Sequence, residues 1–208
     1  MRISVIMPVN LGYYENAITH SADNPEFRFI QAVRSFCKQT FRLAELIIIS
    51  DGCRIAEQLW RKYYSDQQFI HFKYIEKQSQ FSGMVRNTGI EMAQGEIICY
   101  LDHDDAFGVN HLSIINKNFD TSKYDWVYYN DYLVDTIMAE KYERTVIPVQ
   151  RSIGTSSIAH RRNIDVVWGN EYNHDWHMIE KYLLPLPYIK ISTPEYYVCH
   201  FRKTDDFK

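Results

Sequence analysis

Apolar segments alternate with helix-like segments through the first hundred residues, and this order restricts the fold more than any other feature. The segments that suit buried strands are 3–8, 45–50, 69–76 and 96–101. The segments between them that suit helices are 26–38, 54–64 and 83–94. Short apolar strands separated by helices indicate βαβ units. The pattern therefore predicts an α/β fold whose central sheet is mostly parallel and is flanked by helices.

The second hundred residues follow a different pattern. After a helix over 111–119 come longer strand-like stretches, "DWVYYNDYLVDTI" and "KYERTVIPV", then a helix over 175–184 and two short strands. We expect this part to extend the same sheet in a mixed way. The chain has 208 residues, of which 46% are hydrophobic, and contains no linker or repeat, so residues 1–208 are predicted to form a single domain.

Charge and cysteine usage exclude several classes of protein. The formal net charge is −3, which disfavours nucleic acid as a partner. The four cysteines lie far apart without a CxxC pair, as expected for thiols in a reducing compartment. No signal peptide precedes "ISVIMPV", and no apolar run approaches the roughly 20 residues of a membrane span. We therefore expect a soluble, cytoplasmic protein.

Three carboxylates follow the strand-like segment 96–101 directly, in "LDHDDAF". One aspartate could cap the next helix, but three are more than a cap requires. A calcium loop of the EF-hand type fails, because Ala106 and Phe107 occupy its fifth and sixth positions. A divalent cation, Mn²⁺ or Mg²⁺, shared with a substrate phosphate explains the cluster better. Because ligands of parallel sheets bind beyond the carboxyl ends of the strands, 8–10, 50–52 and 102–105 should share one rim.

Several motifs occur in an order that resembles the family 2 glycosyltransferases of the GT-A fold. They are "SVIMPV", "QAVRSFCKQTFRLAELIIISDG", "VRNTGIEMAQGEIICYLDHDD", "TSSIAHRRN" and "NHDW". The resemblance covers nearly the whole chain. It implies an inverting, metal-dependent transfer of a sugar from a nucleoside diphosphate, with a UDP-sugar expected, to an acceptor hydroxyl. Residues 1–105 would form the nucleotide-binding half and 106–208 the acceptor-binding half.

The resemblance also implies roles for individual residues. Asp51 would bind the nucleotide base, with Pro8 and Asn10 beside it, and Arg86 would lie along the nucleotide. Further members of the implied site are Asp102 near the ribose and metal, Asp104 as the principal metal ligand, and His200 as another metal ligand. His103 is expected to point away, and the role of Asp105 stays open between metal site and helix cap.

Asp175 is the candidate base that removes the proton of the acceptor hydroxyl. The resemblance places a Glu-Asp pair at the start of a late helix, where this chain has His174 and Asp175. Two further departures are Ser50, where an aspartate is common, and Asn10, where an aromatic residue is common. Base stacking is thus left to Tyr13 or Tyr14. The "GTSS" segment, 154–157, is expected to line the acceptor side of the cleft.

The acceptor is expected to be a glycan or glycolipid, which leaves peripheral membrane association through the acceptor open. Two alternatives compete with a glycosyltransferase. A nucleotidyltransferase of related fold should carry a glycine-rich, basic loop after the first strand, and "VNLGYYENAITH" has neither property. A non-catalytic nucleotide- or carbohydrate-binding module would not need Asp175 together with the other carboxylates.

Overall fold

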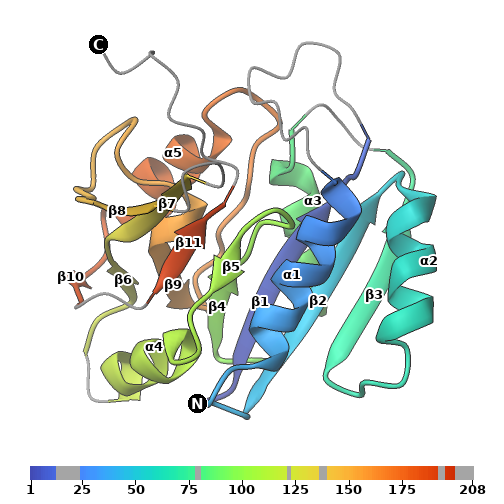
Figure 1. The fold of residues 1–208 in the computed structure, drawn as a ribbon. Coiled ribbons are helices and arrows are strands. Elements are labelled where there is room, and N and C mark those ends of the chain that lie inside the picture. The colour runs from blue at the N-terminus through green and yellow to red at the C-terminus, as the bar shows by residue number, and fades with distance from the viewer. Residues whose placement is uncertain (13–23, 78–80, 121–122, 136–139, 192–194, 200–208) are drawn as a thin grey trace.

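The computed structural model describes residues 1–12, 24–77, 81–120, 123–135, 140–191 and 195–199, and its centre is a seven-stranded sheet (Figure 1). The strand order is β10-β6-β9-β4-β1-β2-β3. The strands are β1 Ile3–Val9, β2 Ala44–Asp51, β3 Ile70–Ile75, β4 Ile97–Tyr100, β6 Trp126–Tyr128, β9 Ile158–Arg161 and β10 Tyr188–Lys190. All neighbouring pairs are parallel except those of β9, which runs antiparallel to β4 and β6. The mostly parallel α/β sheet predicted from the sequence is confirmed.

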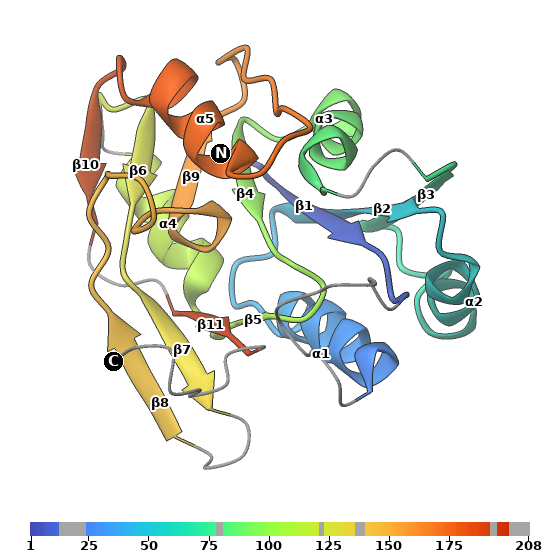
Figure 2. The same ribbon diagram turned by 90° about the horizontal axis from the view of Figure 1, so that it is seen from above.

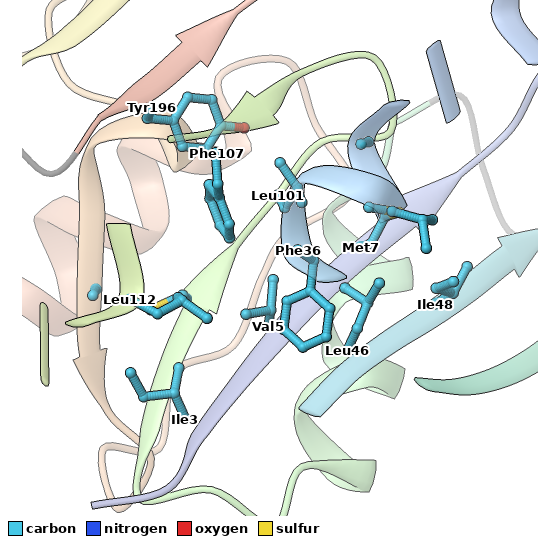
Figure 3. Packing of buried hydrophobic residues seen from close by; sticks show 14 of the residues in the cluster. Ile3, Val5, Met7, Phe36, Leu46, Ile48, Leu101, Phe107, Leu112 and Tyr196 are labelled. Atoms are coloured by element: carbon cyan, nitrogen blue, oxygen red, sulfur yellow. The ribbon is translucent and has the colours of Figure 1, made fainter. Parts of the chain in front are cut away.

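Helices cover both faces of this sheet (Figure 2). One face carries α1 Pro25–Cys37, α2 Arg54–Tyr63 and α4 His111–Asp120, and the other carries α3 Gly83–Met92 and α5 His174–Met178, which continues as a π-helical turn, Ile179–Leu183. Successive residues of β1 therefore enter different cores. Val5 and Met7 pack on the α1 and α4 side (Figure 3), and Ile6 packs on the α3 and α5 side.

The first helix begins where its sequence predicts. Asn24 adopts a left-handed conformation with φ of 64°, and its side chain accepts a hydrogen bond from the Phe27 amide. Pro25 occupies the first turn, where its missing N–H costs nothing. The apolar face of α1 then buries Phe29 and Val33 against the sheet.

The prediction that the second half simply extends the central sheet is wrong in part. The strands β6, β9 and β10 do extend it, but β5 Ala106–Phe107, β11 Tyr196–Val198, β7 Asp131–Asp135 and β8 Glu140–Arg144 form a second, four-stranded sheet. The predicted single strand "DWVYYNDYLVDTI" breaks at Tyr129 and Asn130. There, the Tyr129 hydroxyl donates to the Ile158 carbonyl and the Asn130 side chain accepts from the Val146 amide. These bonds fix the junction between β6 and β7 to β9 and to the segment after β8.

Within the described part of the chain, no helix combines the length and the apolar character needed to cross a membrane. Cys37, Cys53, Cys99 and Cys199 are free thiols, as their spacing predicts.

Candidate functional site

A cavity of about 270 Å³ lies at the carboxyl ends of β1, β2 and β4, beside the start of α3. We call it the first cavity. Its lining residues are Pro8, Val9, Asn10, Asp51, Phe81, Ser82, Val85, Arg86, Asp102, His103, Asp104 and His174. Six of the residues expected around the nucleotide and metal therefore lie together here: Pro8, Asn10, Asp51, Arg86, Asp102 and Asp104. The seventh, His200, lies outside the described residues. His103, which was expected to point away, is also among the residues that line this cavity.

Asp51 ends β2 at the floor of the first cavity and is only 4% exposed. The next residue, Gly52, has φ of 69°, which favours glycine and turns the chain sharply. Asn10 donates from its side chain to the Asp51 carbonyl over 2.9 Å, and the Ser50 hydroxyl donates to the Cys53 carbonyl over 2.7 Å. Ser50 and Asn10, the two departures from the family pattern, thus help to shape the turn that holds Asp51.

Arg86 and Gly89 of the "RNTG" motif are buried on α3, and Asn87 and Thr88 are half-buried. Arg86 is 3% exposed, and its Nη2 donates to Asp102 Oδ1 over 2.5 Å. Asn87 exchanges two hydrogen bonds with the backbone of Trp168, and Gly89 lies against Ile6 so closely that a Cβ would clash. The motif therefore seats α3 on β1 and aims Arg86 at the end of β4. A bidentate donor such as Arg beside an open carboxylate rim also suits a diphosphate.

A second cavity of about 540 Å³ adjoins the first at Asp102, which lines both. The other residues that line the second cavity are Asp105, Leu133, Arg144, Arg151, Ser152, Ile153, Gly154, Thr155, Ser156, Asn173, Asp175, Trp176 and Val198. Asp102 accepts from Arg86 through Oδ1 and from the Thr155 hydroxyl, at 3.3 Å, through Oδ2. The two oxygens of the Asp102 carboxylate therefore bind residues of different cavities, Oδ1 a residue of the first and Oδ2 a residue of the second. Gly154, Thr155 and Ser156 of the "GTSS" segment line the second cavity, as the sequence indicated, and Ser157 is fully buried.

Asp175 stands in the first turn of α5 and is half-buried. Its Oδ1 accepts a hydrogen bond from the Trp176 amide over 2.8 Å. Gly154 lies opposite, and a Cβ there would come within 2.9 Å of Asp175 Oδ2. Asp175 and Asp102 therefore line one cavity although they are far apart in the sequence.

Asp105, whose role the sequence left open, is 2% exposed and binds the chain around β11. It accepts from the Tyr196 hydroxyl over 3.0 Å and from the Cys199 amide over 2.9 Å. The Arg28 guanidinium donates to the carbonyl of the same Cys199. These contacts make Asp105 an anchor for β11 and explain its burial without a helix cap.

Two residues near the cavities, Arg144 and His174, were given no role from the sequence. Arg144 donates to both carboxylate oxygens of the fully buried Asp131, which also accepts from Ser156 and Ser157. His174 lies within 3.3 Å of Arg86 Nη1. Arg144 could have been found only from the register of the β7–β8 hairpin, whereas His174 was visible next to Asp175.

The donor set suits a cation that is shared with a phosphate. No group of three or more His, Cys, Asp or Glu side chains that could hold an ion alone occurs within the described ranges. Asp102 and Asp104 nevertheless line the same cavity, and Mg²⁺ commonly takes one or two carboxylates and completes its shell with phosphate oxygens and water. His200, Tyr13 and Tyr14 lie outside the described residues.

Family comparison agrees with this geometry. The sequence model of glycosyl transferase family 2 matches residues 26–183, and the chain belongs to this family. The chain is 37% identical over 82 residues to the putative glycosyltransferase EpsH of Bacillus subtilis, covering 39% of this chain and 24% of that protein. It is 31% identical over 106 residues to WcaA of Escherichia coli, a putative colanic acid biosynthesis glycosyl transferase, covering 50% and 38%. The chain thus spans less than two fifths of the length of these relatives.

Two solved structures each match 95% of the length of this chain. TarS 1-349 of S. aureus, in complex with UDP-GlcNAc, gives a TM-score of 0.75 at 18% identity, and 58% of that chain is covered. The mannosyltransferase PcManGT of Pyrobaculum calidifontis, in complex with GDP-Man and Mn²⁺, gives 0.66 at 14% identity, with 56% covered. At these identities the likeness concerns the fold alone, and it confirms the expected GT-A fold.

Proposed function

We propose that this chain is the catalytic GT-A domain of an inverting, metal-dependent glycosyltransferase that moves a sugar from a nucleoside diphosphate to an acceptor hydroxyl. The observation that carries the proposal is the pair of adjoining cavities with Asp102 between them. The first cavity offers Asp51, Arg86 and Asp104 to a nucleotide, and the second offers Asp175 to an acceptor.

The first cavity is proposed to hold the nucleotide of the donor. Asp51 would accept a hydrogen bond from the base, because a carboxylate at a buried strand end accepts only. Pro8 and Asn10 flank that position. Arg86 would lie along the nucleotide and keep Asp102 in place near the ribose. A UDP-sugar is the donor we favour, and the complexes of TarS with UDP-GlcNAc and with UDP support a nucleotide-sugar ligand for this fold.

Asp175 is proposed to accept the proton of the attacking hydroxyl in the second cavity. The acceptor oxygen forms a bond to the anomeric carbon while the bond from that carbon to the diphosphate breaks, so the proton passes to a carboxylate and the diphosphate leaves. Attack from the side opposite the leaving group inverts the anomeric centre. The missing side chain of Gly154 leaves room for the Asp175 carboxylate, because a Cβ there would lie 2.9 Å from Asp175 Oδ2.

A divalent cation, Mn²⁺ or Mg²⁺, is part of the proposal. Asp104 and Asp102 would hold it, with His200 as a further ligand. When bound, the cation would stabilise the negative charge that develops on the diphosphate. The Mn²⁺ complex of PcManGT, a relative in fold, supports this choice.

The acceptor is proposed to be a glycan or glycolipid. Relatives named for colanic acid and minor teichoic acid biosynthesis support a polymer of the cell surface as its destination. Peripheral contact with a membrane would then occur through the acceptor. The four free thiols are consistent with a cytoplasmic location, which belongs to the proposal as well.

A thermal-shift panel tests this function directly. UDP-, GDP-, TDP- and CDP-sugars are each added with and without Mn²⁺, and the unfolding midpoint is recorded. Binding to the folded state raises the midpoint by mass action. We expect one class of nucleotide to raise it in a Mn²⁺-dependent way, and Asp104→Asn should remove that dependence. If none of the donors raises the unfolding midpoint in a Mn²⁺-dependent way, the proposal is contradicted.

A further inference from the structure

The first turn of α5, which carries Asp175, receives little support from its own sequence. The helix has five α-helical residues before it continues as the π-helical turn Ile179–Leu183, and its N-cap residue, Asn173, has φ of 62° and makes no side-chain capping bond. A helix this short is marginal without contacts to neighbouring elements. The position of Asp175 therefore depends on what α5 packs against.

The element that α5 packs against at this end is the start of α3. A Cβ added to Gly83 would meet the Gly169 carbonyl oxygen and would lie 3.1 Å from His174 Cδ2. The His174 ring also lies 6.1 Å from the Phe81 ring and 5.8 Å from the Trp168 ring, centroid to centroid. His174 is thus the side chain through which the start of α5 contacts the first cavity.

The polar contacts of His174 show which of its ring nitrogens carries the proton and which one accepts a hydrogen bond. His174 Nδ1 lies 3.1 Å from the Glu171 carbonyl oxygen, which can only accept, so Nδ1 carries the proton. His174 Nε2, at 3.3 Å, then accepts from Arg86 Nη1. Arg86 in turn holds Asp102 with its other terminal nitrogen. A chain of contacts therefore runs from Asp102 through Arg86 and His174 to the residue next to Asp175.

The charge state of the imidazole agrees with this arrangement. Burial, followed by the neighbouring Arg86 guanidinium, lowers the pKa of His174. The ring is therefore neutral at pH 7 and keeps the lone pair that faces Arg86.

We propose that His174 is a positioning residue that sets Asp175 relative to the Arg86–Asp102 pair, so that the base is aligned with the bound donor. The inference rests on the proposed function, and it concerns alignment of the base and not donor affinity. A misplacement of about 1 Å is enough to lower a rate by about a hundredfold. A side chain that merely fills space between α3 and α5 would not need an acceptor atom facing Arg86.

The test compares three variants of the full chain. His174→Ala removes the contact, and His174→Gln keeps an oxygen that can accept from Arg86. The matched control is His177→Ala, which removes an exposed histidine of the same helix that pairs with Glu171. The substrate is the sugar nucleotide that gives the largest midpoint shift in the panel above, with Mn²⁺. Water serves as the acceptor, and release of the nucleoside diphosphate is followed, because this hydrolysis also passes a proton to Asp175.

We expect His174→Ala to lower kcat by about tenfold or more, a larger change than that of the donor Kd, which calorimetry measures. His174→Gln should recover most of kcat, and His177→Ala should match the wild type. If His174→Ala keeps the kcat of the wild type, or if His174→Gln does not restore a lost kcat, the inference is overturned. The proposed function would still stand in that case, because the wild-type protein is active. If the wild type binds no donor in the panel, the proposed function fails, and the inference fails with it.

Discussion

At the scale of single residues, Asp102 shows how one side chain can serve two cavities. Its Oδ1 is held by Arg86, which lines the first cavity, and its Oδ2 is held by Thr155, which lines the second. A carboxylate with both oxygens engaged cannot rotate without breaking a hydrogen bond. In the proposed reaction, Asp102 would therefore be a fixed point against which the donor and the acceptor are oriented.

The candidate base gives a prediction at this scale. Asp175→Asn keeps the size of the side chain but removes its ability to take a proton. Donor binding should persist, whereas turnover should fall by about a hundredfold or more. Calorimetry measures the first quantity and release of the nucleoside diphosphate the second. Asp165→Asn, an exposed position, is the control that should keep full turnover. Unchanged turnover in Asp175→Asn would remove Asp175 from the role of base.

His160 predicts how stability depends on pH. It is fully buried, its Nδ1 lies 2.8 Å from the Arg161 carbonyl, and its Nε2 lies 2.7 Å from the Tyr100 hydroxyl. Burial lowers the pKa of His160 to about 4, so between about pH 6.5 and 4 the unfolded chain binds the proton more tightly. Its contribution is therefore present above about pH 6.5 and is lost as the pH falls toward 4.

Urea denaturation at pH 7.5 and at pH 5 measures this effect. The wild type should lose about 2 kcal/mol more between these values than His160→Gln, which has no proton to bind. Parallel losses in the two proteins, or an NMR titration of the His160 ring near pH 6.5, would contradict the prediction.

At the scale of elements, Gln39 joins α1 to the segment that precedes α4. Its side chain is 1% exposed, donates to the carbonyls of Ser35 and Gly108, and accepts from the Leu112 amide. The "QT" that contributes to the family resemblance therefore has a structural role here. It fixes where α4 starts after the chain leaves the carboxylate rim.

Removing this side chain should destabilise the fold. Gln39→Ala leaves the Gly108 carbonyl and the Leu112 amide without these bonds, at a cost of about 2 to 4 kcal/mol in the free energy of unfolding. Urea denaturation provides the measurement. Gln68→Ala, at an exposed position, should change stability by less than about 0.5 kcal/mol. A Gln39→Ala protein as stable as this control would show that the bonds contribute little.

At the scale of the whole molecule, the sequence predicts the half of the fold that depends on local patterns. Continuous apolar segments such as 45–50 require burial on both faces, which specifies a parallel sheet with helices on each side. The rim then follows from topology, because parallel strands end at the same edge. For this reason the positions of Asp51 and Asp102 around one cavity could be expected before the structure was known.

The second sheet could not be predicted in this way, because it depends on pairings between distant segments. Tyr197 of β11 pairs in parallel with Tyr132 of β7, and no local pattern indicates this partner. The antiparallel entry of β9 between β4 and β6 is likewise a non-local choice. The second cavity is built on these pairings, so Arg144 was missed, while "GTSS" was expected there from its position in a loop and Asp175 from the resemblance.

The anchor at Asp105 has a consequence for synthesis of the protein. Its bond to the Cys199 amide spans 94 residues. At about 5 to 20 residues per second, a ribosome needs on the order of ten seconds to proceed from one residue to the other. Until then the Asp105 carboxylate, which lines the second cavity, lacks its hydrogen bonds from Tyr196 and Cys199. A nascent chain that already contains every residue of the first cavity therefore cannot yet complete the wall of the second cavity that Asp105 and Val198 form.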